Sequence, residues 1–320
     1  NLKSFAMYLR HYQLIPSHRL REAMRDLFGC LVSEGTFFGW DHDLYNALEQ
    51  HEKGVKEQLK RAPVIHVDET GLFCEQKLHW LHGTSTPDMT HYHIHEKRGT
   101  AAMNALGILP EYHGVAVHDF WKPYLTYDCK HALCNAHLIR ELDFIAETTR
   151  QHPSGTPDWA SQIKNLLLHI HETVQNTKQQ RINTLNAPAL RCFERRYDSL
   201  VTEALRSTPC QRSSPHKRGR TKQSKARNLA QRLRDQKQAV LAFMHDFQVP
   251  FTNNQAERDI RMMKVKQKIS GTFRSRHGAD IFCRVRGYLS TSRKNDFSAF
   301  DALSRAFNGN AFVPKIIYAE

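Results

Sequence analysis

The sequence lacks the features of a membrane protein and of a disulfide-stabilised secreted protein. No apolar run approaches the roughly 18–20 residues that cross a bilayer, and residues 1–10 carry neither the apolar stretch nor the cleavage site of a signal peptide. The 7 cysteines are odd in number and include no Cys-x-x-Cys pair, which argues against a disulfide framework and against a four-cysteine zinc module. We therefore expect a protein of the reducing cytoplasm that has no membrane partner.

Acidic residues are also in short supply. The 320 residues include 32 aspartates and glutamates against 46 lysines and arginines, which gives a formal net charge of +14. Nucleic acid is the commonest polyanionic partner of such a chain, although an unrelated basic protein can have the same balance. Residues 211–227 form a linker with seven basic residues and no acidic one, so we expect it either to become ordered against a polyanion or to be a solvated loop.

The chain is long enough for two domains, or for one domain with a large insertion. Its first 60 residues are predicted to be helical. Apolar residues recur at helix spacing between Leu20 and Leu27, Gly29 is suited to end this helix, and Ser33 is suited to begin the next one. A DNA-binding helix-turn-helix and a plain helical hairpin packed on the next domain both fit this pattern.

The next ninety residues alternate between strand and helix patterns. Short apolar, β-branched runs predict strands, and apolar residues at helix spacing predict helices. Three strands followed by alternating helices and strands are typical of an RNase H-like α/β domain. The expected strands cover residues 64–67, 78–83, 89–95, 115–119 and 131–135, and the expected helices cover residues 100–109 and 137–148.

Residues 150–245 interrupt this pattern with long helices and the basic linker. A compact pattern then returns, with a helix expected over residues 255–268 that starts after Asn253 and ends at Gly271. The predicted organisation has four parts, namely a helical region at 1–60, the first part of the RNase H-like domain at 61–149, a helical insertion at 150–245, and the last part of the domain with C-terminal helices at 246–320.

Three carboxylates occupy positions that suit a metal site. Asp68 follows the first predicted strand, Asp119 ends the fourth, and Glu257 lies on the late helix. The first and fourth strands are neighbours in an RNase H-like sheet, so the two aspartates would face each other and a packed helix can add the glutamate. Such oxygen ligands suit Mg²⁺ or Mn²⁺. An aspartate at a strand end is more often a cap or a surface residue, so this spacing alone is weak support.

The sequence motifs around these carboxylates are more specific. They read Val67-Asp68-Glu69-Thr70, His118-Asp119-Phe120-Trp121-Lys122-Pro123-Tyr124 and Asn253-Asn254-Gln255-Ala256-Glu257-Arg258. All three closely resemble the acidic motifs of the insertion sequence 66 family of DDE transposases. The likeness continues, in the family's order and over nearly the whole chain, at residues 134–142, 217–220, 223–228 and 268–275.

This resemblance implies an RNase H-like fold with a helical insertion before the last carboxylate, and Asp68, Asp119 and Glu257 as the metal ligands. It also implies metal-dependent DNA cleavage and strand transfer at the ends of a bacterial insertion sequence. The expected partners are terminal inverted repeats and target DNA, further copies of the chain, and accessory proteins of the element, all at the nucleoid. Family members usually carry an upstream helical segment and a cysteine-rich, zinc-binding module, which we expect this chain to lack.

Basic residues follow the third carboxylate along its helix. Arg261, Lys264 and Lys268 share the helix face of Glu257 and are expected to line the DNA path, with a solvated face as the alternative. The other residues predicted to contact DNA are Arg258 on this helix and Lys217, Arg218, Arg220 and Lys225 in the linker.

Several other residues near these motifs have two interpretations. Cys134 and His137 form a Cys-x-x-His step that suits either a zinc site or packing. Glu69 could touch a metal, although a surface position is the simpler expectation. Trp121 and Tyr124 are suited to stack on an unpaired DNA base or to close the core.

Histidines at positions 91, 93 and 95 alternate along a predicted strand, so they point to one face and form either a metal site or an exposed polar face. Two other functions also remain open at this level. One is a structure-selective nuclease that nicks DNA without joining it, and the other is a DNA-binding relic of a mobile element without catalytic activity.

Overall fold

The structure is a computed structural model that describes residues 2–150, 158–210 and 221–314. Three residues predicted to contact DNA, Lys217, Arg218 and Arg220, lie outside these described ranges. No helix in the described part of the chain is both long enough and apolar enough to cross a membrane. The chain divides into two compact units, the first with Asn1–Ala116, Trp121–Cys129 and Asn254–Glu320, and the second with Val117–Phe120 and Lys130–Asn253.

A mixed α/β fold is built around a five-stranded sheet with the order β3-β2-β1-β4-β5. The first three strands pair antiparallel, and the predicted adjacency of the first and fourth strands is confirmed. The strands are β1 (Val64–Cys74), β2 (Lys77–Ser85), β3 (Thr90–His95), β4 (Val115–His118) and β5 (Lys130–Leu133), with short 3₁₀ helices η2 (Leu109–Glu111) and η3 (Lys122–Thr126) around β4.

The first strand is longer than predicted. The apolar pattern ended at residue 67, whereas β1 continues to Cys74 because its residues from His66 onward each have a partner on β2. Glu75 and Gln76 join the two strands with φ angles of 51° and 62°, as in the tightest β-hairpin turns. Asp68 therefore lies inside a strand, and the prediction that it follows one was wrong.

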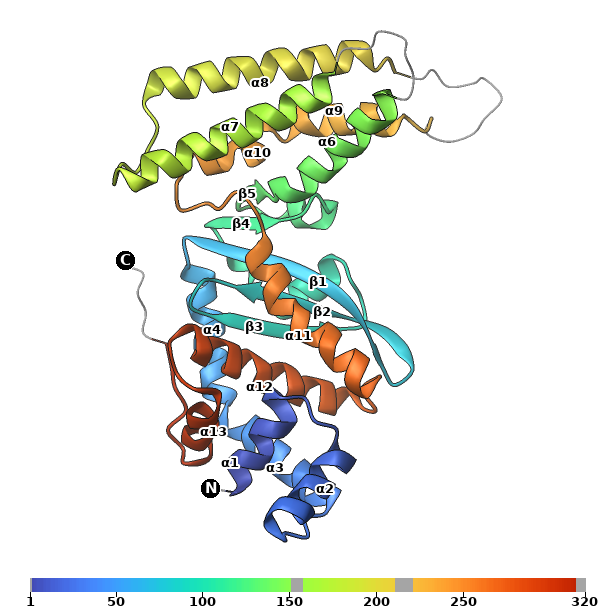
Figure 1. Cartoon of the computed structure of the whole chain (residues 1–320), viewed down its shortest axis with the longest axis vertical. Helices are drawn as coiled ribbons and strands as arrows, with labels where there is room; N and C mark the ends of the chain where they lie inside the picture. Colours follow the sequence, from blue (N-terminus) through green and yellow to red (C-terminus); the bar gives the residue numbers. More distant parts are fainter. Residues whose placement is uncertain (1, 151–157, 211–220, 315–320) are drawn as a thin grey trace. The chain divides into compact units, whose positions relative to one another are not determined.

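Helices α11 (Asn254–Ser270) and α12 (Arg276–Lys294) belong to the first unit and pack on one face of this sheet (Figure 1). Side chains alternate between the two faces of a strand, and Leu72 and Leu81 share a core with Ile260 on this face. Buried apolar contacts of this kind stabilise a fold by about 25 cal/mol per Å² of apolar surface removed from water. They set α11 across β1 and β2.

The opposite face of the sheet packs against α4 (Glu49–Arg61) and α5 (Thr100–Leu106). Ile65 and Val67 of β1 share a core there with Leu59 of α4. Neighbouring residues of β1 therefore belong to different cores, and this alternation decides the surroundings of each acidic residue of the strand.

Local helix signals are confirmed. Helix α2 (Ser17–Phe28) ends at Gly29, which adopts a left-handed φ of 64°. The Ser33 hydroxyl accepts a hydrogen bond from the Thr36 amide and begins α3 (Glu34–Ala47). Gly271, with a φ of 67°, follows the end of α11 in the same way.

The N-terminal helices pack on the C-terminal ones. Helices α1, α2, α3, α12 and α13 share one core that buries Leu20 and Phe37. Helix α3 carries Glu34, Asp41 and Asp43 and no lysine or arginine, which is the wrong charge for a helix in a DNA groove. The plain helical hairpin is therefore the better interpretation. The remaining elements of this region are α1 (Leu2–Met7), the π-helical turn η1 (Tyr8–Tyr12) and α13 (Ala299–Phe307).

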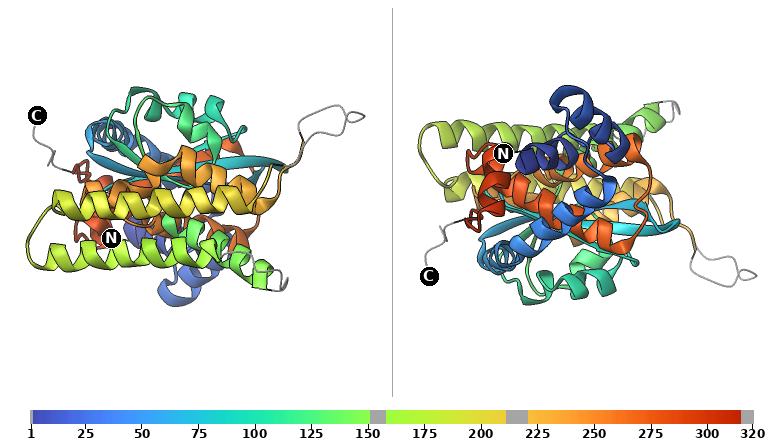
Figure 2. Two further views of the ribbon diagram at one scale, coloured as in Figure 1. Left: turned by 90° about the horizontal axis from the view of Figure 1, so that it is seen from above. Right: turned by 90° about the horizontal axis from the view of Figure 1, so that it is seen from below.

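The second unit is mostly helical. Its two longest helices, α7 and α8, run side by side (Figures 1 and 2), and both begin at a side-chain cap, Asp158 and Asn186 respectively. The Tyr197 hydroxyl of α8 is buried and donates to the Leu233 carbonyl of α9 (2.8 Å). The helices are α6 (Asn135–Arg150), α7 (Trp159–Gln179), α8 (Ala187–Ser207), α9 (Lys225–Asp235) and α10 (Lys237–His245).

Candidate active site

Asp68 lies on the sheet face that α11 covers. Its partner across the β1–β2 pair is Gly83, and a Cβ added to Gly83 would lie 3.3 Å from the side chain of Ile260 on α11. Because directly opposed residues of an antiparallel pair share a face, the Asp68 side chain projects toward the same side. Asp68 is half-buried, and its Oδ1 accepts a hydrogen bond from the Glu69 amide (2.9 Å).

Glu257 lies in the first turn of α11, three residues before Ile260 and on the same side of the helix. Two hydrogen bonds fix α11 to the sheet, from the Tyr92 hydroxyl to the Asp259 carbonyl (2.6 Å) and from Lys264 Nζ to the Gly71 carbonyl (3.3 Å). Asp68 of the sheet and Glu257 of α11 therefore lie on the same side of the first unit's sheet. A carboxylate in the first helical turn is also favoured by the helix dipole.

Asp119 directly follows β4, one residue beyond the strand that it was expected to end, and is half-buried. Its carbonyl oxygen is hydrogen-bonded by the imidazole of His118, whose other ring nitrogen lies 3.0 Å from His131 Nδ1. Burial lowers the pKa of His118 to about 4, so this ring is neutral near pH 7. The neutral His118 ring thus holds the backbone at Asp119 without adding its own charge beside the Asp119 carboxylate.

Glu69 follows Asp68 directly but belongs to the opposite face. Its Oε1 accepts hydrogen bonds from Arg98 Nε (2.9 Å) and Nη2 (2.7 Å), and its Oε2 accepts one from the Tyr124 hydroxyl. Only 1% of the Glu69 side chain is exposed, so the expected surface position was wrong. The strand places Glu69 against Arg98 and Tyr124, which are distant in the sequence. The local sequence of Glu69 does not indicate these contacts.

Arg98 completes this buried network and was not recognised from the sequence. Its guanidinium lies over the ring of Trp80 (4.8 Å) and over that of Trp121 (4.2 Å). Tyr124 is 2% exposed and belongs to the core under α4 and α5. Of the two interpretations for Trp121 and Tyr124, these contacts favour closing the core.

Cys134 and His137 form a contact pair in the second unit. Their ligand atoms lie within 4.8 Å of each other, and Cys134 Sγ accepts a hydrogen bond from the Asn253 amide (3.1 Å). Burial alone would raise the pKa of the Cys134 thiol, but hydrogen bonds with His137 and Asn253 outweigh it and the pKa is lowered. These contacts hold the backbone directly before α11, and the close pair of ligand atoms suits packing and metal binding alike.

The histidine face of β3 is not the exposed polar face that was expected. His91 is buried beside α4, with Nε2 3.9 Å from Glu52, and His93 is half-buried opposite His82 of β2. Burial lowers the pKa of His91 to about 3, and those of His82 and His93 to about 4. The alternation was predicted correctly, but the packing of α4 against β3 is a tertiary contact that no local pattern indicates.

The basic residues expected along α11 are on the surface. Arg258, Arg261, Lys264 and Lys268 are exposed, and they follow the half-buried Glu257 along one helix. Exposed cations of this kind are available to phosphate groups. In the second unit, the exposed Lys225 lies over the ring of Phe144, with Nζ 4.5 Å from the ring centroid.

A five-stranded mixed sheet with an acidic helix start packed on one face is compatible with an α/β nuclease-like domain. The family model for the IS66 family of transposases matches residues 1–281, and the chain belongs to this family. The resemblance seen in the motifs is thereby confirmed. A comparison with curated proteins finds no match. Family membership implies a transposition-related function, DNA as a partner and a requirement for a divalent metal.

Proposed function

We propose that this chain carries the catalytic centre of a DDE transposase that cuts DNA at the ends of a bacterial insertion sequence and joins them to target DNA. The proposal assigns the sheet to an RNase H-like domain, with the helices of the second unit as its insertion. Its main support is that Asp68 of β1 projects toward the same side of the sheet on which α11 places Glu257. The neighbouring position of β4, which leads to Asp119, adds support.

The chemistry of the three side chains fits a hard divalent cation. Asp68, Asp119 and Glu257 supply only carboxylate oxygens, the ligand type that Mg²⁺ and Mn²⁺ prefer. These residues would hold two divalent metal ions, which would supply the positive charge that activates a water or a 3′-hydroxyl and stabilises the leaving oxygen. The chain contributes negative charge through these three carboxylates. It holds DNA phosphates with the exposed cations of α11.

The contrast between Asp68 and Glu69 supports the choice of ligand within the first motif. Both oxygens of Glu69 accept hydrogen bonds from Arg98 or Tyr124, and its side chain faces away from α11. Asp68 projects toward α11 and is half-buried. In this proposal Asp68 binds the metal, and Glu69 stiffens the strand that presents it.

Cleavage of an uncut element end, and joining of pre-cut ends to a target plasmid, test the proposal together. We expect cleavage and joining in Mg²⁺ or Mn²⁺, and loss of both in Asp68→Asn, Asp119→Asn and Glu257→Gln. Glu111→Gln is a matched control, because Glu111 is an exposed acid paired with Lys60, and it should keep full activity. Cleavage without joining would identify a nuclease instead, and DNA binding without either reaction would identify a relic. Full activity in any of the three variants would remove that residue from the site.

A further inference from the structure

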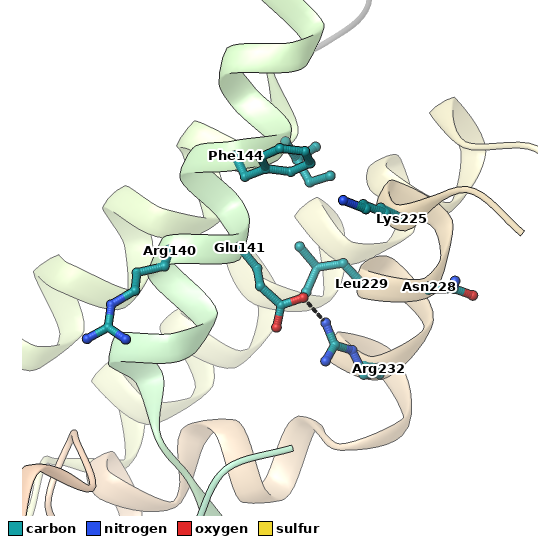
Figure 3. A pocket seen from close by; sticks show the side chains of 8 residues that line it. Arg140, Glu141, Phe144, Lys225, Asn228, Leu229 and Arg232 are labelled. Carbon is teal, nitrogen blue, oxygen red and sulfur yellow. Dashed lines mark hydrogen bonds and ion pairs between the residues drawn. The ribbon is translucent and has the colours of Figure 1, made fainter. Parts of the chain in front are cut away.

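A groove between α6 and α9 lies within the second unit. It encloses a cavity of about 450 Å³ (Figure 3), which is within the range of small-ligand pockets. Helix α6 and helix α9 each contribute four lining residues. Those of α6 are Arg140, Glu141, Phe144 and Ile145, and those of α9 are Lys225, Asn228, Leu229 and Arg232.

The groove combines an apolar floor with a cationic rim. Phe144 is 44% exposed, whereas Ile145 and Leu229 beneath it are buried. Phe144 and Lys225 point toward each other from the two helices (Figure 3). Within the described ranges, no carboxylate forms an ion pair with Lys225. The ring and the cation therefore offer an apolar surface and a positive charge side by side in one cavity.

The position of Lys225 is not explained by helix stability. It is the first residue of α9, whose first turn contains no acidic residue, and a cation at that end of a helix is opposed by the helix dipole. A bound anion reverses this penalty. The cavity and the aromatic side chain beside it set the size and the chemistry of that anion.

The other end of the groove leads toward Asp119. Arg232 forms an ion pair with Glu141, and its guanidinium also lies over the ring of Phe120 (4.7 Å). Phe120 is the residue that directly follows Asp119. A strand with its scissile phosphate at Asp119 would therefore pass Arg232 before it reaches Phe144 and Lys225.

We propose that this groove binds a nucleotide of an unpaired DNA strand next to the cleavage point, with the base against Phe144 and a phosphate on Lys225. This inference rests on the proposed function. Between two helices the cavity has room for a single nucleotide and not for a duplex. Stacking on an aromatic ring accepts any base, which suits a strand whose sequence is read elsewhere. An acidic peptide of a partner protein is the competing occupant.

Fluorescence anisotropy with the full chain tests this inference without metal and without catalysis. The probes are a blunt duplex and the same duplex with a four-nucleotide single-stranded overhang. We expect the chain to bind the overhang probe more tightly. Phe144→Leu keeps an apolar side chain but loses stacking, and Lys225→Gln removes the charge. Each should weaken overhang binding about tenfold, and this loss should exceed any change in blunt-duplex binding. Lys225→Gln should also reduce the salt dependence of overhang binding by about 0.7 in log–log slope.

The second unit offers a matched control pair. Lys178 lies over the ring of Phe247 (5.7 Å), away from the groove residues. Phe247→Leu and Lys178→Gln therefore make the same chemical changes and should not alter binding of either probe. Thermal melting checks that all four variants fold. An overhang that carries 5-iodouracil should cross-link to α6 or α9 in the wild type.

The outcomes separate the two proposals. If the chain binds neither probe, both the proposed function and the groove inference are overturned. If it binds both probes equally, or if groove and control variants behave alike, the groove inference alone is overturned. The groove inference is also overturned if an acidic peptide occupies the groove and the DNA does not. In that case the peptide binds only when Phe144 and Lys225 are intact, yet it displaces no overhang DNA from the wild type.

Discussion

The two faces of the sheet in the first unit carry similar polar residues in different surroundings. On the α11 face, Asp68 is half-buried beside a helix whose exposed residues are cationic. On the α4 face, Glu69 is enclosed by Arg98 and Tyr124, and His91 is buried and neutral. The alternation of one strand thus gives adjacent acids opposite tasks. On the α4 face, Arg98 neutralises the charge of Glu69, whereas on the α11 face the proposed task of Asp68 is to bind the metal.

The sharpest test of this comparison is Asp68→Asn. We expect cleavage of end substrates to fall by on the order of a thousandfold or more, because one anionic metal ligand is lost. The free energy of unfolding should stay the same or rise slightly, since the side chain keeps its shape and a repulsive charge disappears. Single-turnover cleavage and urea unfolding on one preparation measure both effects. A large loss of stability would show that Asp68 belongs to the supporting network instead.

Glu69→Gln should have the reverse profile. The change leaves Arg98 without its carboxylate, and removal of one partner from a buried pair typically costs about 3–5 kcal/mol. Arg98 is 39% exposed, so solvent screening reduces the expected loss to about 2 kcal/mol. Urea unfolding gives the value. Glu111→Gln, which removes an exposed acid, should stay within about 0.5 kcal/mol of the wild type. Equal losses in the two variants would contradict the buried network.

The α4 face should also make the protein sensitive to acid. His91, His82 and His93 have pKa values lowered by burial to about 3, 4 and 4, so the folded chain keeps them neutral while the unfolded chain takes up protons below about pH 6.5. Their contribution to stability is complete above pH 6.5 and is lost as the pH falls toward 4. Each group contributes a slope of up to about 1.4 kcal/mol per pH unit.

His91→Gln should flatten this pH dependence, because it removes the group whose pKa is lowered furthest among the three. His18→Gln provides the control, since His18 is exposed on α2. Urea unfolding at several pH values between 4 and 7 measures the slopes. Identical slopes for the wild type and His91→Gln would show that acid acts elsewhere in the molecule.

The smallest expected effect concerns the spacing between α11 and the sheet. Gly83→Ala places a Cβ 3.3 Å from the Ile260 side chain, so this side chain must give by a few tenths of an ångström and press on the helix that carries Glu257. We expect a stability loss of about 1 kcal/mol and a fall in cleavage of about fivefold, since misplaced catalytic groups cost rate steeply. Gly39→Ala, where the added Cβ meets nothing within 4 Å, should leave cleavage unchanged. Unaltered cleavage in Gly83→Ala would separate Glu257 from the site.

Features with local signals could be predicted from the sequence. Gly29, Ser33 and Gly271 mark helix boundaries because backbone conformation and capping at these residues depend on the residue itself. The adjacency of β1 and β4 followed from the order of the elements. The position of Asp119 after β4 followed from a short apolar run.

Features that depend on distant contacts could not be predicted. The polar stretch from Asp68 to Gly71 resembles a strand end, yet it stays extended because β2 pairs with it. The burial of Glu69 depends on Arg98, 29 residues away, and the burial of His91 depends on α4. In each case a polar residue has the same local sequence signature whether it faces solvent or a partner, and only the tertiary packing distinguishes the two.

The hydrogen bond between the Asn253 amide and Cys134 Sγ joins residues 119 positions apart. A second one, from the Asn135 amide to the Phe251 carbonyl (3.0 Å), lies beside it. The long excursion that contains α6 to α10 therefore leaves and returns at a single point, as an inserted module requires. Recombination can lengthen, shorten or exchange such a module without moving its two ends. New helical modules can therefore be exchanged at this point, as at a cloning site, without any change in the local sequence around Asp119 and Glu257.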